Sequence, residues 1–497
     1  MENLKFRRQF LFSAKKCNQL AGWKEEKIGR YNLYVHPENE INRLKNDDMD
    51  IILIGHFINP HFPDKSNLEI LADILACKSI NDISTCLYSL VGRFVLIIKR
   101  NDNFIFFHDS CGLKSIFYTK QDEEFYAASQ PLLLKKIVNV KKGKKYYDYT
   151  ESKYKKSDLE HWIPSGSSLY ENVFHLVPNY YLDVSKFEQI RYWPTKQLKV
   201  KNLEESVEEF SNILKNTMEA AKKRFKIALP ITAGWDSRII LSACKDIADD
   251  IYFYTFIYRE LNKKSTDIAI PKKILSKLGY KHHILDCNRS LDENFADLYV
   301  KNSDMAHLND WGFIANGMIK EFPQEKTTIK GNCSEIGRCV YYDLIEINPD
   351  ISSSKGFLNL GTDGWEEIVF VKSQIKKWFD EIKNENINLG YNLLDLFYWE
   401  QRMGSWQAQA QLEWDIVHDS FTPFNNREII DIMLAVDSQY RKKPNYLFFT
   451  KVIEQLWEEL LEEPINPKPF SLKFRIIMRK ILIKIRVFKL IKKSIGR

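Results

Sequence analysis

The first 135 residues contain apolar runs of strand length separated by short polar turns. Such runs lie at residues 50–56 (DIILIGH), 94–99 (FVLIIK) and 104–108 (FIFFH). Residues 116–119 and 124–128 flank the polar segment 120–123, which is the pattern of a β-hairpin. A stretch at residues 67–76 predicts the one helix of this part. We therefore expect stacked antiparallel sheets with few helices.

From about residue 200 the pattern changes to alternating helices and strands. Apolar residues at helical spacing predict helices at 200–224, 236–245 and 266–278. Short apolar runs predict strands at 225–231, 251–257, 282–286 and 327–330. This alternation favours a parallel sheet with crossover helices. Residues 365–463 are predicted to be mainly helical, and the Lys- and Tyr-rich segment 141–156 to be an exposed loop.

The segment from Thr232 to Ser237 joins a predicted buried strand to a predicted helix through small residues. Thr232, Ala233 and Gly234 form the loop, and the helix begins at Asp236 and Ser237. Unpaired N–H groups and the positive end of a helix attract anions, and small side chains let phosphate oxygens approach the backbone. Asp236 would bind magnesium, which prefers carboxylate and phosphate oxygens. The alternative is an ordinary turn with a helix cap. The Walker A pattern is absent.

Three segments in order along the chain resemble motifs of the asparagine synthetase family. Residues 232–237 (TAGWDS) resemble its pyrophosphate loop S-G-G-x-D-S. Residues 264–268 (KSTDI) and 278–283 (LGYKHH) resemble its S-x-D-I and L-G-x-x-H stretch. Residues 330–336 (KGNCSEI) resemble G-E-G-S-D-E, and the later Arg402-Met403 and Pro423-Phe424 pairs resemble its R-M and P-F pairs.

The N-terminal part resembles the glutaminase domain of the same family. The matching segments are residues 55–59 (GHFIN), 90–94 (LVGRF), 109–118 (DSCGLKSIFY), 126–130 (YAASQ), 176–179 (LVPN) and 192–194 (YWP). Glutaminase chemistry in this family uses an N-terminal Cys whose α-amino group is the base. This chain begins Met-Glu-Asn and its first Cys is Cys17. We therefore expect this part to be a scaffold without glutaminase activity, as in β-lactam synthetases and lasso-peptide cyclases.

The resemblance implies a fold class and three regions. Residues 1–195 would be a degenerate glutaminase-like domain, an α+β antiparallel β sandwich of the Ntn (N-terminal nucleophile) type. Residues 200–463 would be an ATP-dependent ligase domain of the α/β adenine-nucleotide alpha-hydrolase-like (PP-loop) class, with a helical C-terminal part. Residues 464–497 would be a basic amphipathic tail.

The implied chemistry activates a substrate carboxylate with ATP and Mg²⁺ as an acyl-adenylate, with release of pyrophosphate. Ammonia or an amine then captures the acyl group as an amide. Asp236 and Glu335 would bind the magnesium ion. The residues implied for the ATP pyrophosphate are Thr232, Ala233, Gly234, Asp236, Ser237 and Gly331.

Two candidate catalytic residues match the family incompletely. Lys451 is loosely aligned with its late lysine, and Asn332 differs from the residues that the family has at that position. The resemblance implies that a late lysine neutralises the adenylate transition state. Lys451 is our choice, with Lys442 and Lys443 as competitors. Asn332 occupies a position that is Glu in asparagine synthetases and Tyr in β-lactam synthetases. Because Asn is no base at neutral pH, the activation of the nucleophile is unexplained. Loss of the second half-reaction is the alternative.

The charge distribution and the cysteine content bear on the location of the protein in the cell. The net charge is +7, of which residues 468–497 carry +11, so the remainder carries −4. The eight cysteines show no metal-site spacing, which fits a reducing, cytoplasmic location. Neither a signal peptide nor an apolar run of membrane-spanning length is visible. Adjacent His282 and His283 should point to opposite faces of a strand and share no metal.

Residues 470–495 interleave apolar and basic residues at helical spacing, which fits a helix lying on an anionic membrane surface at the inner face of the cell membrane. Packing of this tail on the negatively charged remainder is the alternative. Membrane attachment would suit a uronic-acid sugar of a surface polysaccharide as the carboxylate substrate. The alternatives are a peptide or amino-acid cyclase or amidase, a tRNA-modifying PP-loop enzyme, or a silent scaffold. No nucleic-acid partner is expected, because the basic residues lie outside the catalytic regions.

Overall fold

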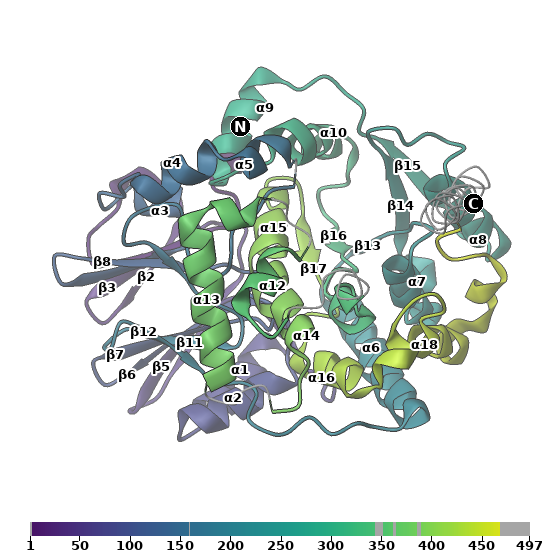
Figure 1. Ribbon diagram of the computed structural model, residues 1–497, viewed down its shortest axis with the longest axis horizontal. Helices are drawn as coiled ribbons and strands as arrows, with labels where there is room; N and C mark the ends of the chain where they lie inside the picture. Colours follow the sequence, from purple (N-terminus) through teal and green to yellow (C-terminus); the bar gives the residue numbers. More distant parts are fainter. Residues whose placement is uncertain (1, 159, 343–350, 361–363, 385–388, 468–497) are drawn as a thin grey trace, which may run out of the picture.

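The computed structural model describes residues 2–467 except 159, 343–350, 361–363 and 385–388. A β-rich N-terminal part lies beside a parallel sheet that is surrounded by helices (Figure 1). Within the described residues, no helix combines the length and the apolar character needed to cross a membrane.

Two antiparallel six-stranded sheets form the β-rich part. The first has the strand order β10-β8-β9-β1-β3-β2 and the second β12-β11-β7-β6-β5-β4. The strands of the first sheet are β1 (Phe10–Ser13), β2 (Lys24–Ile28), β3 (Tyr31–Val35), β8 (Phe117–Gln121), β9 (Glu124–Ala128) and β10 (Phe174–His175). Those of the second are β4 (Ile41–Lys45), β5 (Met49–Ile58), β6 (Val91–Arg100), β7 (Asn103–His108), β11 (Tyr180–Asp183) and β12 (Glu188–Arg191).

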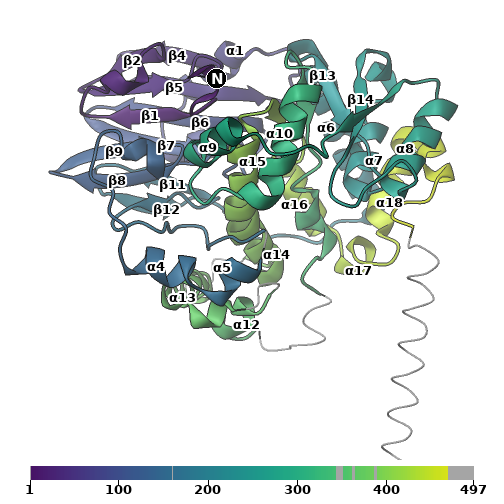
Figure 2. The same cartoon turned by 90° about the horizontal axis from the view of Figure 1, so that it is seen from above.

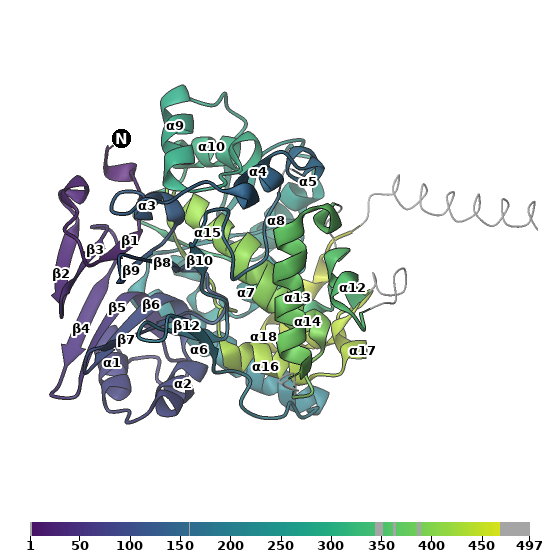
Figure 3. The same cartoon turned by 60° about the vertical axis from the view of Figure 1, so that its left-hand side comes forward.

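The second sheet is buried on both faces, which explains its continuous apolar runs. Ile52 and Ile54 pack in the core between the two sheets, whereas Ile51 and Leu53 pack in a core formed with α1 (Asn67–Leu75) and α2 (Ile80–Tyr88). Figure 3 shows these two helices beneath the second sheet. The prediction of antiparallel sheets and of the hairpin is confirmed.

The sequence analysis missed helix α2, although its residues Ile80, Ile83 and Leu87 have helical spacing. Its start carries a further sequence signal. Ser79 and Asp82 form a capping box, just as Ser66 and Glu69 do at α1. The same spacing of a Ser and an acid three residues later could have identified both helices.

The third sheet has five parallel strands in the order β15-β14-β13-β16-β17. Its strands are β13 (Ile227–Pro230), β14 (Tyr252–Ile257), β15 (His282–Asp286), β16 (Thr327–Ile329) and β17 (Asp419–Phe421). The four strands predicted for this sheet are present. The fifth, β17, has only three residues and lies within the region predicted to be helical, so apolar periodicity gave no sign of it.

The predicted crossover helices are also present, as α6 (Leu203–Arg224), α7 (Trp235–Ser242) and α8 (Thr266–Lys277). They lie around β13 and β14 (Figure 2), and the end of α6 also contacts β5 of the β-rich part. The remaining helices are α3 (Pro131–Leu134), α9 (Glu293–Asn302), α10 (Phe313–Glu321), α12 (Ser354–Leu358), α13 (Val369–Asn384), α14 (Leu393–Phe397), α15 (Ala408–Trp414), α16 (Arg427–Ala435), α17 (Ser438–Arg441) and α18 (Leu447–Trp457).

The Lys- and Tyr-rich segment is not the exposed loop that the sequence predicted. It forms α4 (Lys144–Thr150) and α5 (Lys153–Ser157), in which Tyr149 and Tyr154 are fully buried. Tyr149 hydrogen-bonds His161, and Tyr154 packs edge-on against Trp365. The lysines remain at the surface while the tyrosine rings enter the core, so average polarity misled the prediction.

Candidate active site

The two acids predicted to share a metal lie together at one edge of the parallel sheet. β13 and β16 are neighbouring strands, so their carboxyl ends meet at this edge. Asp236 lies in the first turn of α7, directly after β13, and Glu335 lies in the short 3-10 turn Ser334–Arg338 after β16. Ser334 donates a hydrogen bond from Oγ to the Asp236 carboxylate.

Gly331 allows the two loops to approach each other closely. A Cβ atom added at Gly331 would lie 2.6 Å from the Cβ of Asp236, which no side chain tolerates. The glycine predicted for the ATP site is therefore required for the packing of these loops. Cys333, two residues later, has a φ of 76°, a conformation that favours glycine. It occupies the second Gly of the G-E-G-S-D-E pattern.

The N–H groups of the small-residue loop do not match the expectation of unpaired donors. The N–H of Thr232 donates to Ser237 Oγ at 3.1 Å, and that of Gly234 donates to Thr232 Oγ1 at 3.1 Å. The N–H of Ala233 donates to the carboxylate of Asp267 at 3.0 Å. Side chains within the motifs therefore fix the shape of the loop. The α7 start itself has no side-chain cap, so its first-turn N–H groups remain the donors for an anion.

Arg338 is a site residue that the sequence reasoning missed. Its Nη2 atom lies 2.7 Å from Asp236 Oδ1 and 3.7 Å from Glu335 Oε1. Its side chain is only 12% exposed, so this cation is held within the site rather than in solvent. A sequence signal existed, because Arg338 follows Glu335 by three residues, the spacing of an ion pair on a helical turn.

The acids fit a magnesium ion. Glu335 is largely buried, and its Oε2 atom has no hydrogen-bond partner among the described residues. Burial and the nearby Asp236 carboxylate raise the pKa of Glu335 to about 7, as expected for a carboxylate that lacks sufficient positive charge nearby. Magnesium is typically bound by one or two carboxylates plus phosphate oxygens and water. Two acids with a free buried oxygen meet that requirement, although the described residues contain no group of three metal-ligating side chains.

A second arginine, Arg402, lies near Glu335. The positive charge of Arg402 lowers the pKa of Glu335, in opposition to burial. The Arg402 guanidinium lies 4.5 Å from the centre of the Trp406 ring and 5.8 Å from that of Trp162. The Arg402-Met403 pair picked out from the sequence therefore contributes a cation to the site. Together with Arg338, it makes the region around the two acids able to hold phosphate oxygens.

Asn332 and Gly331 line a cavity of about 340 Å³ next to the acids. Its wall is strongly aromatic, and the rings come from Tyr254, Phe256, Tyr258, Trp311, Trp406 and Trp414. A volume of this size is at the lower end of small-molecule sites. The cavity also contains the Lys330 side chain, which the sequence analysis assigned no role.

Lys451 lies on α18, a helix that packs against α6 and α7. Its Nζ atom is 3.8 Å from the carboxylate of Glu204 on α6, and no ion pair with Asp236 or Glu335 is found among the described residues. The competing Lys442 and Lys443 lie between α17 and α18, in the segment that ends at Tyr446. The ring of Tyr446 contacts that of Trp235, the residue next to Asp236.

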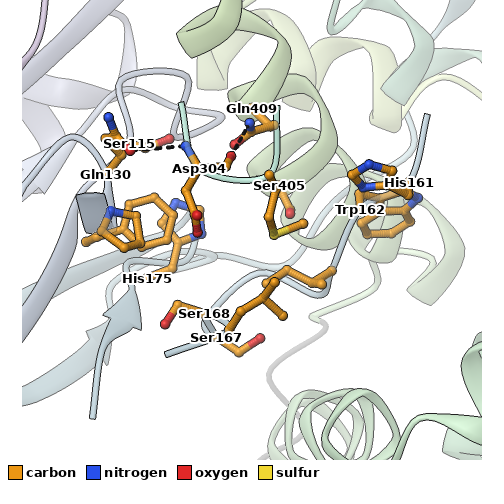
Figure 4. Close-up of a pocket in the computed structure, with 15 residues that line it drawn as sticks. Ser115, Gln130, His161, Trp162, Ser167, Ser168, His175, Asp304, Ser405 and Gln409 are labelled. Carbon is orange, nitrogen blue, oxygen red and sulfur yellow. Dashed lines mark hydrogen bonds between the residues drawn. The ribbon is translucent and has the colours of Figure 1, made fainter. Parts of the chain in front are cut away.

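A smaller cavity at the junction of the two parts has about 30 Å³ of space (Figure 4). Asp304 crosses it, held by hydrogen bonds of its backbone to the side chains of Gln130 and Gln409. This space admits only one or two water molecules, so the cavity is too small for a substrate.

Two further predictions concern the adjacent histidines and the C-terminal tail, and the structure describes only the first of these. His282 and His283 do point to different neighbours, since His282 contacts Thr255 Oγ1 at 2.8 Å and His283 stacks on Tyr252. The predicted amphipathic helix of the tail lies outside the described residues, which end at Pro467. The last of these reach the loop, where the N–H of Asn466 donates to the carbonyl of Ala233 at 2.8 Å.

No protein-family model matches the chain. Two solved structures are matched at 10% identity, the "allosteric regulatory enzyme of purine biosynthesis" (TM-score 0.25, 60% of this chain and 72% of that one) and the glutamine phosphoribosylpyrophosphate amidotransferase of B. subtilis (TM-score 0.24, 59% and 63%). TM-scores this low carry no argument.

One curated relative, named "putative asparagine synthetase (glutamine-hydrolyzing) 1" of Methanocaldococcus jannaschii, is 24% identical over 197 residues. The match covers 37% of this chain and 34% of the relative, so this chain spans about a third of that protein's length. Over this segment the chain is therefore distantly similar to a protein named as an asparagine synthetase.

Proposed function

We propose that this protein is an ATP-dependent ligase of the PP-loop class that activates a carboxylate as an acyl-adenylate and forms an amide. The observation that carries the proposal is the meeting of Asp236, Ser334 and Glu335 at the carboxyl edge of the parallel sheet. These residues come from two loops that are 98 positions apart in sequence and are joined by the Ser334–Asp236 hydrogen bond. A ligand site at the carboxyl ends of parallel strands is the general location for this type of sheet.

In this proposal the pyrophosphate of ATP binds at the start of α7. The first-turn N–H groups of α7 and the guanidinium groups of Arg338 and Arg402 would hold the phosphate oxygens. A magnesium ion bound by Asp236 and Glu335 would supply further positive charge to the leaving pyrophosphate. The substrate carboxylate attacks the α-phosphorus and pyrophosphate departs. An amine then attacks the acyl carbon, and AMP departs.

The nitrogen would come from ammonia, an added amine or the substrate itself. The N-terminal residues serve instead to connect the two parts of the molecule. Arg7 Nη1 donates to the carbonyl of Ile416 at 2.9 Å, and Arg8 Nη1 to that of Asp415 at 2.6 Å. We therefore propose that the β-rich part is a scaffold without glutaminase activity.

For the carboxylate we propose a uronic-acid sugar of a surface glycan. The aromatic cavity next to Asn332 favours a ring-shaped ligand, because flat aromatic faces offer large apolar contact areas. The tail beyond Pro467 would attach the enzyme to an anionic membrane. Sedimentation with anionic vesicles tests that part. The full chain should pellet at low salt and a chain truncated after Pro467 should not, whereas equal behaviour would remove the membrane argument.

The test of the central proposal is exchange of labelled pyrophosphate into ATP, measured with a panel of carboxylates that includes glucuronate, galacturonate and amino acids. Asp236→Asn and Glu335→Gln should each abolish exchange, while Asp249→Asn, an exposed acid beside the same sheet, should not. Exchange that persists in either site variant would refute the metal assignment. Lys451→Met, Lys442→Met and Lys443→Met in the same assay identify which lysine acts on the adenylate.

A further inference from the structure

Lys330 is the first residue after β16. It directly precedes the loop that begins at Gly331, and it lines the aromatic cavity. It is followed directly by Gly331, whose backbone lies against Asp236. Side chains alternate along a strand, so Lys330 points to the same face as Thr328. Thr328 hydrogen-bonds Tyr254 at 2.6 Å, and both residues line the cavity together with Lys330. The lysine amine therefore faces the cavity, one residue away from the loop that contacts Asp236.

No counter-ion contacts this amine within the described part of the chain. The Lys330 Nζ atom has neither a hydrogen bond nor an ion pair there, and it lies 5.5 Å from the centre of the Trp414 ring. The side chain is largely but not fully buried. A lysine so placed without an acidic partner is uncommon, because burial penalises its charged form. This placement therefore favours the neutral amine.

The charged groups around it come from three elements. Arg93 at the start of β6 opposes the charge of Lys330, and Asp415 after α15 favours it. These two form an ion pair with each other, so their effects on Lys330 largely cancel. His418, before β17, is uncharged because burial and Lys330 hold its pKa far below the ordinary range. Burial is the dominant effect and lowers the pKa of Lys330 to about 7.

We propose that Lys330 is the base that takes a proton from the amine nucleophile, and that this amine binds beside Lys330 in the aromatic cavity, next to the sugar ring of the carboxylate substrate. This proposal rests on the proposed function. Lys330 would be the proton acceptor that Asn332 cannot be, since an amide side chain accepts no proton at neutral pH.

The step balances as follows. An ammonium ion entering the cavity transfers one proton to the neutral amine of Lys330. The resulting free amine uses its lone pair to form a bond to the acyl carbon of the adenylate. The bond between that carbon and the phosphate oxygen breaks, and AMP leaves with the electron pair. The new nitrogen releases its excess proton to water, and Lys330 then returns its own proton to solvent.

Other titratable groups of the cavity are less suited to this step. Arg259 forms an ion pair with Asp310. Its Nη2 atom also lies 3.3 Å from the Glu160 carboxylate, so Glu160 already has a cationic partner. A protonated arginine has no lone pair to accept a proton. His418 is a poor proton acceptor, because burial and the nearby Lys330 hold its pKa well below the ordinary range.

The proposal is tested by separating the two half-reactions in Lys330→Met and Lys330→Arg. Pyrophosphate exchange reports adenylation, and amide formation from ammonium chloride reports capture. Hydroxylamine serves as a second nucleophile, because it is largely unprotonated at neutral pH and needs no base. Lys326→Met is the matched control, since Lys326 lies at the other end of β16 and its amine is also near a ring, that of Tyr252 at 5.6 Å.

We expect both Lys330 variants to keep exchange and hydroxylamine capture within about threefold, and to lose amide formation from ammonium by on the order of 100-fold, the lower range for general base catalysis. Their residual rate should rise with pH as free ammonia increases, whereas the wild-type rate should level off above about pH 7. The control variant should resemble the wild type. Normal amide formation by Lys330→Arg would overturn the proposal, because arginine retains the charge but cannot act as the base.

A second measurement does not depend on turnover. Reductive methylation with ¹³C-formaldehyde labels the lysines, and the signal of Lys330 is the one missing from Lys330→Met. Titration of this signal near pH 7 is expected, and titration near the ordinary value of about 10.4 would overturn the proposal. If wild-type protein shows no exchange with any acid, the proposed function fails and this role fails with it. Intact exchange with unchanged ammonium capture in both variants refutes the role of Lys330 alone.

Discussion

The β-rich part and the parallel sheet both bury charged side chains, but the charges have different surroundings. Arg93 at the start of β6 meets Asp415 through both of its terminal nitrogens, and the side chains are only 6% and 2% exposed. At the edge of the parallel sheet, Glu335 has an oxygen without a hydrogen-bond partner and Lys330 has no acid in contact, among the residues that the structure describes.

This difference separates structural charges from functional ones. A buried pair with complete hydrogen bonding fixes how two parts of a protein meet. Buried charges without full compensation cost stability and are retained where a ligand supplies the missing partner. Substitutions of Arg93, Arg338, Asp431 and Ser334 test this distinction.

Loss of Arg93 should destabilise the junction strongly. Arg93→Met leaves the buried Asp415 carboxylate unpaired, and breaking such a pair costs about 3–5 kcal/mol. The midpoint of denaturant unfolding should fall accordingly. Arg43→Met is the control, because Arg43 forms its ion pairs on a strand edge where its side chain is 30% exposed. A fall in the midpoint no greater than that of the control would show that the Arg93–Asp415 pair is not structural.

Arg338 should matter for activity more than for stability. If it holds phosphate oxygens, Arg338→Met should lower pyrophosphate exchange by roughly 100-fold, as expected for one electrostatic group at a transition state. Arg338→Lys keeps a positive charge and should retain part of the rate. The unfolding midpoint should change less than in Arg93→Met. Normal exchange with a lowered midpoint would place Arg338 among the structural charges.

Asp431 provides a test of the junction by pH. It lies on α16, accepts a hydrogen bond from Tyr391 at 3.0 Å, and burial raises its pKa to about 7. Its native pKa exceeds the unfolded value of about 3.9, so the folded form binds the proton more tightly. The associated stability is full below about pH 4 and is lost as pH rises through 7.

Asp431→Asn should therefore flatten the dependence of stability on pH between 4 and 7. It should also stabilise the protein above pH 7, by on the order of 1–2 kcal/mol after allowance for partial exposure. Denaturant unfolding at pH 5 and pH 8 measures both effects. Identical slopes in the two proteins would contradict the raised pKa.

Ser334 should show the smallest effect. Its Oγ donates to the Asp236 carboxylate and helps to orient it. A single hydrogen bond to a charged group contributes about 1.5–3 kcal/mol at most, and water can replace the lost donor in a partly exposed site. Ser334→Ala should therefore lower pyrophosphate exchange by about tenfold with little change in stability. A loss as large as that of Asp236→Asn would indicate a direct role for Ser334.

The long apolar strands and the hairpin of the β-rich part, the strands of the parallel sheet apart from the short β17, the three crossover helices and the order of the motifs could be predicted from the sequence alone. Long apolar runs such as residues 50–56 could only be buried strands, and alternating helices and strands after residue 200 required a parallel sheet. The loop from Thr232 to Ser237 was identified from small residues between a strand and a helix. These features are local, because backbone geometry and side-chain periodicity act within a few neighbouring residues.

Which charged side chains contact each other depends on the tertiary structure. Arg338 faces Asp236 because β13 and β16 are neighbours in the sheet, which no local pattern states. The burial of Tyr149 and Tyr154, the three-residue strand β17 and the isolation of Lys330 likewise depend on partners distant in sequence. Burial and pairing set the protonation of a side chain, so its chemistry follows from the packed fold and not from its residue type alone.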